Sequence, residues 1–486
     1  MSQYSFSYSY DSLYDAFNAV NRKGKMQKRY LSPEYLVAAQ EYREMREELN
    51  MILRKKKAER TEEEMAKIEE LRQLMKINAQ QQKILLQDHL KKVSSRILSN
   101  SFRFTLTPDA SKNPEKPLYT IGTTAEEFFA MQVLCRNVKK LFKISMSSRH
   151  EILSQLKMLL KEDKSRYYII RTDVHRCYES IPHTKLFEYL YGNNLLDVKS
   201  KSLLHGLIRK EFESKNLRPL VKTPHTGIPR GCAISSLLSE FYLSKIDETI
   251  KQKLPGLIFL GRYVDDIVMV IHPDIRSEYY KPINWYIDEV KDIYALMGLE
   301  IHIPSDGTGK CYIYDSDNGE DLDFNLLGYN IHIDNENRKK LIFSLTQDKK
   351  DNITKRIDKS FATFDRMIDI VGYDVAAHYL FDALHVLTCN INLYNAKKGV
   401  KVGIFYSNQL LDNKKDLSYL DGQLKRNIGR LNLSSKTSIA TTDITSLEEK
   451  LKNKLALLSF TMGFNYPHKR YKIKKRRLRT IKSSWS

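Results

Sequence analysis

Two adjacent carboxylates, Asp265 and Asp266, have the chemistry that is simplest to interpret in this sequence. They interrupt two apolar, strand-like runs within residues 259–271, a pattern that predicts a hairpin with acids at its tip. Two like charges about 4 Å apart repel by about 4 kcal/mol near a protein surface, and a divalent cation such as Mg²⁺ turns that cost into a binding site. Alone, such a pair is more often a charged hairpin turn, so the evidence for a metal site must come from the surrounding residues.

A third carboxylate, Asp173, supplies a second acidic segment. Nucleotidyl transfer by two metal ions needs acids from separate parts of the chain, because these acids bridge ions about 3.5–4 Å apart. Asp173 lies near the end of the strand-like run of residues 167–174, and the aromatic residue Tyr178 follows it closely. The two segments together could therefore form a two-metal site.

The two acidic segments resemble the palm of a reverse transcriptase. In that family an Asp-x-x-x-x-(Phe/Tyr) motif supplies a metal-binding acid and a steric gate for the sugar, and Asp173 and Tyr178 match it. A Tyr-x-Asp-Asp motif supplies the other acids, and residues 263–266 match it fully. The resemblance implies polymerisation of dNTPs with two Mg²⁺ ions, or Mn²⁺ in their place. The residues that it makes catalytic are Asp173, Asp265 and Asp266, and the metal site that it implies is formed by Asp173, Val174, Asp265 and Asp266.

Further motifs extend the resemblance over roughly residues 100–335. Residues 227–238 resemble the family's Pro-Gln-Gly motif with its following Ser-Pro and helix, but Arg230 replaces Gln and Ser236 replaces Pro. Because the Gln contacts the incoming nucleotide in the family, Arg230 puts the preference for nucleotide or template in question. Residues 298–300, with Lys310 downstream, resemble the motif whose Lys helps pyrophosphate leave.

Two weaker matches complete the set. Residues 327–331 resemble the hairpin that grips the primer, and Lys116 lies where the family has an Arg that could hold the triphosphate. The substrate-binding residues that the resemblance implies are Tyr178, Val174, Arg230, Lys116 and Lys310.

Alternatives remain beside these assignments. Lys116 is equally an ordinary cation at a strand edge, and Arg171 and Arg176 are candidates for ion pairs within the palm. An RNA-dependent RNA polymerase is disfavoured by Tyr178, because an aromatic gate leaves no room for a 2′-hydroxyl. A noncatalytic RNA-binding scaffold with a degenerate palm is disfavoured by the three intact acids.

The elements expected around these motifs give an α+β fold of the right-hand polymerase kind. It would comprise fingers, a palm with a ferredoxin-like antiparallel sheet, a helical thumb and an N-terminal helical extension. Residues 34–58 and 61–98 predict a helical hairpin, because they lack Gly and Pro and are rich in strong helix formers. Residues 61–64 have the form of a capping box that starts the second helix. Residues 183–215 are expected to be helical, and strands are expected near 102–106, 299–303 and 324–333. The expected division is a Tyr-rich arm with this hairpin over 1–98, fingers and palm over 99–340, a thumb or C-terminal domain over 341–468, and a basic tail over 469–486.

Composition points to a polyanionic partner. The chain has 486 residues and a formal net charge of +21, a balance typical of proteins that bind nucleic acid. We expect an RNA template, a DNA product and dNTPs as partners. Association with a second copy of the chain or with a partner protein is a further possibility, and we expect no binding to a membrane. The five scattered cysteines lack any Cys-x-x-Cys pair, which argues against a zinc site and favours a reducing cytoplasm.

A narrower resemblance concerns the kind of reverse transcriptase. Residues 147–152, the Arg-Gly form of the second motif, and residues 403–406 with 417–424 resemble the bacterial defence-associated reverse transcriptases. That subgroup implies a standalone antiviral enzyme that works with a noncoding RNA, or that starts from a protein hydroxyl or without a template. The Tyr4–Tyr14 cluster motivates the protein-primed start. The alternative is a group II intron-like or retron-like enzyme of a mobile element, although no Cys/His cluster or His-Asn-His-type nuclease segment follows the thumb.

Overall fold

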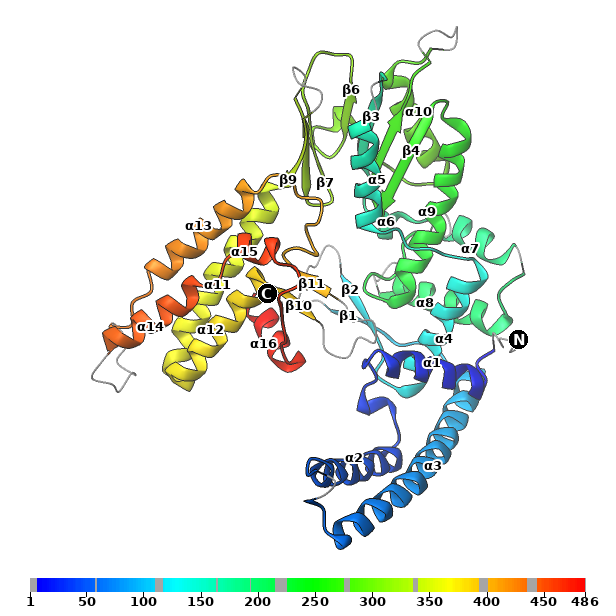
Figure 1. Cartoon of the computed structure of the whole chain (residues 1–486). Helices are drawn as coiled ribbons and strands as arrows, with labels where there is room; N and C mark the ends of the chain where they lie inside the picture. Colours follow the sequence, from blue (N-terminus) through cyan, green and yellow to red (C-terminus); the bar gives the residue numbers. More distant parts are fainter. Residues whose placement is uncertain are drawn as a thin grey trace. The chain divides into compact units, whose positions relative to one another are not determined.

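The computed structural model describes ten stretches of the chain: residues 7–56, 59–109, 117–162, 165–192, 194–214, 225–274, 280–334, 340–392, 401–434 and 444–485. The chain forms two compact units, each assembled from segments far apart in the sequence (Figure 1). Unit 1 comprises Met1–Met146, Val174–Leu254 and Tyr286–His302. Unit 2 comprises Ser147–Asp173, Pro255–Trp285 and Ile303–Ser486. The functional division at residues 98, 340 and 468 stays a proposal.

Unit 1 begins with three helices, α1 (Tyr10–Arg22), α2 (Pro33–Leu53) and α3 (Glu62–Leu98). Helices α2 and α3 pack as a hairpin. Thr61 and Glu64 form a reciprocal capping box that starts α3, which satisfies backbone N–H groups that a helix start otherwise leaves unpaired. Before α1, Tyr8 is fully buried and its hydroxyl lies 2.9 Å from Ser200 Oγ. Tyr8 is therefore part of the core rather than of a loose arm, and Tyr4 lies outside the described residues.

The rest of unit 1 contains a small hairpin and six helices. Strands β1 (Leu106–Asp109) and β2 (Leu118–Ile121) pair antiparallel. The helices are α4 (Ala125–Leu141), α6 (Cys177–Ser180), α7 (His183–Tyr191), α8 (Val198–Ser214), α9 (Ala233–Lys253) and most of α10 (Ile283–Leu296). Residues 183–215, expected to be helical, form two helices: α7 ends at Tyr191, α8 begins at Val198, and Asn194 between them has a φ of 49°, which a right-handed helix does not accommodate. The strand expected near 102–106 starts only at Leu106.

A four-stranded antiparallel sheet, in the order β4-β5-β3-β6, forms the centre of unit 2. Its strands are β3 (Tyr168–Asp173), β4 (Leu257–Tyr263), β5 (Asp266–Ile271) and β6 (Tyr312–Asp315). Helix α5 (Arg149–Glu162) packs on β4, where a Cβ on Gly261 would lie 2.7 Å from Ile152 Cγ2. This mixture of helices with antiparallel strands confirms the α+β class, and the sheet is the palm that the sequence predicts.

A second antiparallel sheet in unit 2, in the order β7-β8-β9, precedes the C-terminal helices. Its strands are β7 (Leu322–Leu326), β8 (Tyr329–Ile333) and β9 (Leu341–Leu345). Residues 324–333, expected as one strand, turn back at Leu327 and Gly328, whose φ values are 48° and 78°. In unit 1, the strand expected near 299–303 is reduced to a single bridge between Ile301 and Val174.

The last part of unit 2 is mainly helical. Its helices are α11 (Gln347–Val371), α12 (Tyr373–Thr388), α13 (Lys415–Gly429), α14 (Ile444–Ala456), α15 (Phe460–Asn465) and α16 (Lys475–Trp485). A three-stranded sheet of β10 (Asn390–Asn392), β11 (Lys401–Gly403) and β12 (Arg470–Tyr471) lies among them. The basic C-terminal run is thus folded rather than a loose tail: Ile481 of α16 is fully buried, and Trp485 Nε1 donates to Ser360 Oγ of α11 at 2.9 Å.

Candidate active site

The three predicted catalytic acids lie at one end of the palm sheet. Strands β4 and β5 pair with Tyr263 opposite Asp266, so Val264 and Asp265 form the tip of a tight hairpin. Strand β3 pairs with β5 so that Asp173 lies directly opposite Asp266. Val264 has a φ of 61°, a conformation that is a genuine outlier for a β-branched residue and that is found mostly at functional sites. The fold thus brings together acids that are far apart in the sequence.

Two cations contact these acids. Arg171 Nη2 lies 3.2 Å from Asp266 Oδ1, and its Nη1 donates to the Lys310 carbonyl oxygen at 2.8 Å. Lys310 Nζ lies 3.5 Å from Asp173 Oδ2. Arg171 is therefore an ion-pair partner within the palm, and it also fixes the backbone of the loop that carries Lys310.

The electrostatics of the hairpin tip are unfavourable for three ionised acids. Burial raises the pKa of Asp266, the Arg171 guanidinium opposes that rise, and the carboxylates of Asp265 and Asp173 add to it. A carboxylate that is disfavoured by burial and by like charges is typical of a functional site. A bound divalent cation would reverse this penalty.

The donor set at this end of the sheet fits Mg²⁺ or Mn²⁺, since all three side chains offer carboxylate oxygens. In the described ranges, however, no group of three or more acid, His or Cys side chains already converges closely enough to hold a metal ion. Asp173, Asp265 and Asp266 are thus neighbours whose side chains must still turn toward a common ion. The side chain of Val174 is buried, so this residue could contribute only through its backbone.

Tyr178 and Arg230, predicted to contact the nucleotide, lie together in unit 1. The Arg230 guanidinium carbon lies 5.5 Å from the Tyr178 ring centroid, and its Nε lies 3.5 Å from Glu179 Oε1. The Ile228 N–H donates to the Tyr178 carbonyl oxygen at 2.8 Å. Glu179, which sequence reasoning did not single out, therefore orients Arg230; its position directly after Tyr178 was the only signal in the sequence.

The turn that carries Arg230 is held by strand β2. The Tyr119 N–H donates to the Arg230 carbonyl oxygen at 2.7 Å, and Ser235 Oγ donates to the Pro229 carbonyl oxygen at 2.5 Å. Gly231 has a φ of 93°, and a Cβ there would lie 2.9 Å from the Tyr119 carbonyl oxygen. Only glycine fits this conformation and this approach without strain. Lys116, the other predicted triphosphate contact, lies outside the described residues.

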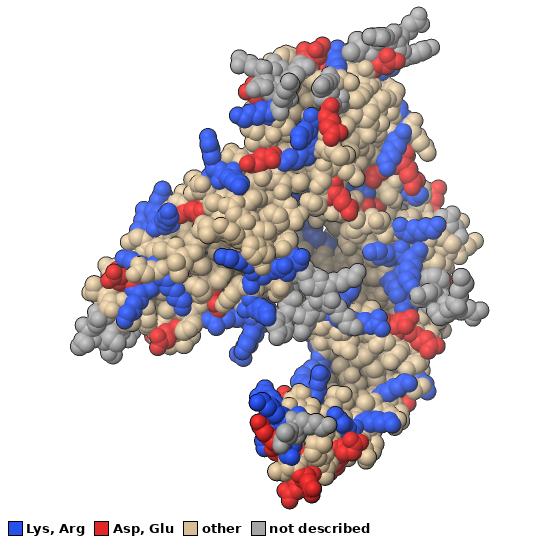
Figure 2. Space-filling view, in the orientation of Figure 1, with Lys and Arg blue, Asp and Glu red and all other residues tan. Residues whose placement is uncertain are grey.

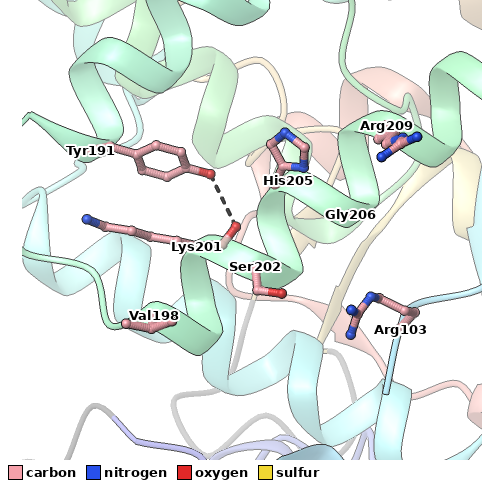
Figure 3. A pocket seen from close by; sticks show the side chains of 8 residues that line it. All are labelled: Arg103, Tyr191, Val198, Lys201, Ser202, His205, Gly206 and Arg209. Carbon is pink, nitrogen blue, oxygen red and sulfur yellow. Dashed lines mark hydrogen bonds between the residues drawn. The ribbon is translucent and has the colours of Figure 1, made fainter. Parts of the chain in front are cut away.

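A basic pocket of about 580 Å³ opens in unit 1 beside α8 (Figure 3). None of its eight lining residues is acidic; they are Arg103, Tyr191, Val198, Lys201, Ser202, His205, Gly206 and Arg209. The Tyr191 hydroxyl donates to the Lys201 carbonyl oxygen at 3.2 Å, and Lys201 Nζ lies 5.4 Å from the Tyr191 ring centroid. Burial lowers the pKa of neighbouring Lys199, and the Arg103 charge adds to that effect. The pocket is therefore a region of positive potential.

Basic side chains are widespread on the surface. Figure 2 shows Lys and Arg side chains on the exposed faces of both units. Helix α16 contributes Arg476, Arg479 and Lys482, all exposed. In the described ranges, no helix is both long and apolar enough to cross a lipid bilayer. All five cysteines are free.

Comparison with known proteins assigns the central segment to a family. Residues 119–304 match the family model for reverse transcriptase (RNA-dependent DNA polymerase), and this range contains all three acids. The segment is thus a reverse transcriptase domain. A COX1/OXI3 intron 2 protein of Saccharomyces cerevisiae is 26% identical over 114 residues, 24% of this chain and 13% of that protein. An uncharacterized 91 kDa protein in the cob intron of Schizosaccharomyces pombe is 24% identical over 183 residues, 34% of this chain and 21% of that protein.

Solved structures similar to this chain include two telomerases. One is telomerase from Candida albicans in complex with a TWJ fragment of telomeric RNA, with a TM-score of 0.32 and 10% identity over 68% of this chain and 58% of that chain. The other is apo telomerase from Candida tropicalis, with a TM-score of 0.30 and 13% identity over 73% of this chain and 58% of that chain.

Proposed function

We propose that this protein is an RNA-directed DNA polymerase that makes cDNA by two-metal nucleotidyl transfer. The observation that carries the proposal is the register of the palm sheet, which sets Asp173 opposite Asp266 and beside the Asp265 tip. The match of residues 119–304 to the reverse transcriptase family supports the same chemistry. Because the chain covers only a small share of its curated relatives, the activity, substrates and partners of the whole protein are all part of this proposal.

The reaction joins the 3′-hydroxyl oxygen of a primer to the α-phosphorus of a dNTP and breaks the bond to the β-phosphate, so that pyrophosphate leaves. Metal ions held by Asp173 and Asp265, with Asp266 in support, would stabilise charge on both the attacking and the leaving oxygens. Arg171 holds Asp266 in place from β3. Lys310, which contacts Asp173, carries the charge that favours departure of pyrophosphate.

Selection of the nucleotide falls to Tyr178 and Arg230. An aromatic ring beneath the sugar excludes a 2′-hydroxyl and so favours dNTPs. Arg230, held by Glu179 and the Tyr178 ring, adds a charged group where the family's Gln is uncharged, and a guanidinium can bind a phosphate or a base edge through paired N–H groups.

The basic pocket of unit 1 supports a nucleic-acid partner, and we propose that this partner is an RNA template. Its cations Arg103, Lys201 and Arg209 match phosphate groups. A dedicated noncoding RNA is the partner that a standalone enzyme of this kind would use, and a second copy of the chain or a partner protein stays within the proposal.

The biological setting has two candidate assignments. Residues 147–152 and the Arg230–Gly231 motif resemble the bacterial defence-associated enzymes, and on that basis we propose an antiviral role with a noncoding RNA or a protein-primed start. The burial of Tyr8 removes one hydroxyl from the candidates for priming. The intron-associated names of both curated relatives favour the second assignment, an intron-type reverse transcriptase of a mobile element.

Sequencing the nucleic acid that copurifies with the protein, before and after addition of dNTPs, tests the proposal. An RNA-directed polymerase converts RNA into complementary DNA that resists RNase, and the identity of the RNA separates a dedicated noncoding RNA from an intron. DNA that stays attached to protein until protease treatment would support a protein hydroxyl as primer. Products made only from rNTPs would instead support an RNA polymerase.

A further inference from the structure

Two cations flank the tyrosine that follows the β7–β8 turn, within unit 2. Arg149 is the first residue of α5, and Lys349 lies in the first turn of α11. The Arg149 guanidinium carbon lies 5.3 Å from the Tyr329 ring centroid, and Lys349 Nζ lies 5.1 Å from it. Gly328 of the turn is close to both, since a Cβ there would lie 3.4 Å from Arg149 Nη2 and 3.5 Å from Lys349 Cδ. Two positive charges, those of Arg149 and Lys349, thus lie close together beside the Tyr329 ring and the β7–β8 turn.

Neither cation is neutralised by an acid in the part of the chain that the structure describes. Arg149 Nε and Nη2 are buried and have no hydrogen-bond partner there. Lys349 Nζ donates to the amide oxygen of Asn408, an uncharged group. The nearby acid Asp412 is already engaged, because it pairs with Lys157 at 2.7 Å and accepts the Phe343 N–H at 3.0 Å.

This arrangement costs stability in the free protein. A buried guanidinium nitrogen without an acceptor bears an uncompensated loss of hydration. Burial lowers the pKa of Lys349 to about 8, and the Arg149 charge adds to the effect. Contacts of the two cations with the Tyr329 ring recover only part of this loss, because the attraction of a cation to an aromatic ring is weak beside the cost of dehydrating a charge. The local fold therefore lacks a negative group that would pair with these two side chains.

A pocket beside Arg149 provides room for such a group. It measures about 290 Å³, and its lining includes Arg149, His150, Tyr329, Tyr406, Ser407 and Gln409. A water molecule occupies about 30 Å³ in the liquid, so a tetrahedral oxyanion with several waters fits. His150, Ser407 and Gln409 add hydrogen-bond donors, and the lining at the start of α5 lies at the positive end of the helix dipole.

We propose that this pocket binds a phosphate group through Arg149, which lines it, and that Lys349, which lies nearby beside the Tyr329 ring, adds to the positive charge. The guanidinium can donate N–H groups to phosphate oxygens, and the ammonium adds a point charge. The phosphate could belong to a nucleic-acid strand or to free phosphate or pyrophosphate. The first source rests on the proposed function, whereas the second does not.

Acetylation of Lys349 at pH 8, followed by mass spectrometry of the full-length protein, measures this binding. Only the neutral amine reacts, so at pH 8 an anion that raises the pKa of Lys349 from about 8 by one unit slows its acetylation by about fivefold. The reaction is run alone, with inorganic phosphate, with pyrophosphate, and with a short RNA–DNA duplex. Lys350 is the internal control, because its Nζ already lies 3.3 Å from Asp416 Oδ1 and its rate should not change.

Three variants separate the outcomes. In Arg149→Gln the protection of Lys349 should fall at least severalfold, whereas Arg149→Lys, which keeps the charge and the fold, should retain part of it. Asp265→Asn should abolish polymerisation and leave the protection intact, which distinguishes failure of the pocket from failure of the proposed function. Protection by the duplex alone identifies a strand phosphate, and protection by the small anions identifies a free one. Unchanged Lys349 acetylation with every anion, or protection that survives in Arg149→Gln, would overturn the proposal.

Discussion

At the scale of single residues, the palm gathers charges that the fold alone does not favour. Asp266 is held by Arg171 yet crowded by Asp265 and Asp173, and Val264 takes a strained backbone conformation to place them. Such features reduce stability and are retained where chemistry requires them. A substitution of Asp266 tests this interpretation.

Asp266→Asn should raise the melting temperature of the metal-free protein at pH 7. Folding raises the pKa of Asp266, so the protonated form of this side chain stabilises the folded state. That stabilisation is complete below the pKa of an unfolded aspartate and is lost as the pH rises through the pKa of Asp266 in the folded protein. At neutral pH the buried charge is thus a net cost that Asn removes. Thermal unfolding from pH 4 to pH 8 should show the difference shrinking as the pH falls. An Asn variant that is less stable at every pH would contradict the interpretation.

Tyr178→Ala should weaken discrimination between dNTPs and rNTPs. Removing the ring opens space for a 2′-hydroxyl, so we expect relative incorporation of rNTPs to rise by roughly tenfold or more, the scale of a lost steric contact. Single-nucleotide incorporation with each substrate measures this ratio. Tyr178→Phe is the matched control and should keep the wild-type preference, because only the ring is needed. Equal discrimination in all three proteins would remove Tyr178 from the gate.

At the scale of elements, the best-predicted features were those with strong local signals. The β4–β5 hairpin followed from acids between two apolar runs, and the capping box at Thr61 placed the start of α3. The break between α7 and α8 was missed because the segment between Tyr191 and Val198, where Asn194 has a φ of 49°, is short and lies inside an otherwise helical pattern. Helix α16 was taken for a tail, since its charges obscured the few apolar contacts, such as Ile481, that anchor it.

The residues of the candidate site likewise fall into those that a local sequence pattern predicts and those that only the structure reveals. The three acids could be found from motif spacing, because nucleotidyl transfer constrains both residue types and their order. Glu179 beside Arg230 and the Arg149–Lys349 pair could not. Their roles depend on side chains meeting across elements, and no short-range pattern reports such meetings.

The turn of Gly231 gives a prediction for one element. Gly231→Ala places a Cβ against the Tyr119 backbone at a φ of 93°, so we expect a loss of about 1–2 kcal/mol of stability from the backbone conformation alone. The displaced Arg230 should also weaken nucleotide affinity, seen as a raised KM for dNTPs. Gly422→Ala is the matched control: no atom lies within 4 Å of its Cβ position in α13, and alanine there should stabilise the helix by about 0.5–1 kcal/mol. Equal effects of the two substitutions would contradict the role of the turn.

At the scale of the whole molecule, a net charge of +21 governs the encounter with nucleic acid. Counterion release makes such binding strongly dependent on salt. Exposed cations on α16, in the pocket of unit 1 and over both units offer many phosphate contacts, of which only some bind at a given time.

Neutralising Arg476, Arg479 and Lys482 together should weaken binding of an RNA–DNA duplex. If each contacts a phosphate, the slope of log affinity against log salt should fall by about one per residue. Neutralising the exposed Arg72, Lys76 and Lys83 of α3 removes the same charge and serves as the control. Fluorescence anisotropy from 50 to 300 mM salt compares the two triple variants. Equal slopes for both would show that net charge, and not α16, sets the affinity.

The central claim is that Asp173, Asp265 and Asp266 form one metal site for DNA synthesis. Single-turnover extension of a DNA primer on an RNA template, measured against Mg²⁺ concentration, tests it most directly. We predict that Asp173→Asn and Asp265→Asn each lower the rate by at least about a thousandfold, as loss of a transition-state contact of about 4 kcal/mol would, and that Asp292→Asn, an exposed acid of α10, changes nothing. Full extension by either palm variant, or extension without any divalent metal, would contradict the account.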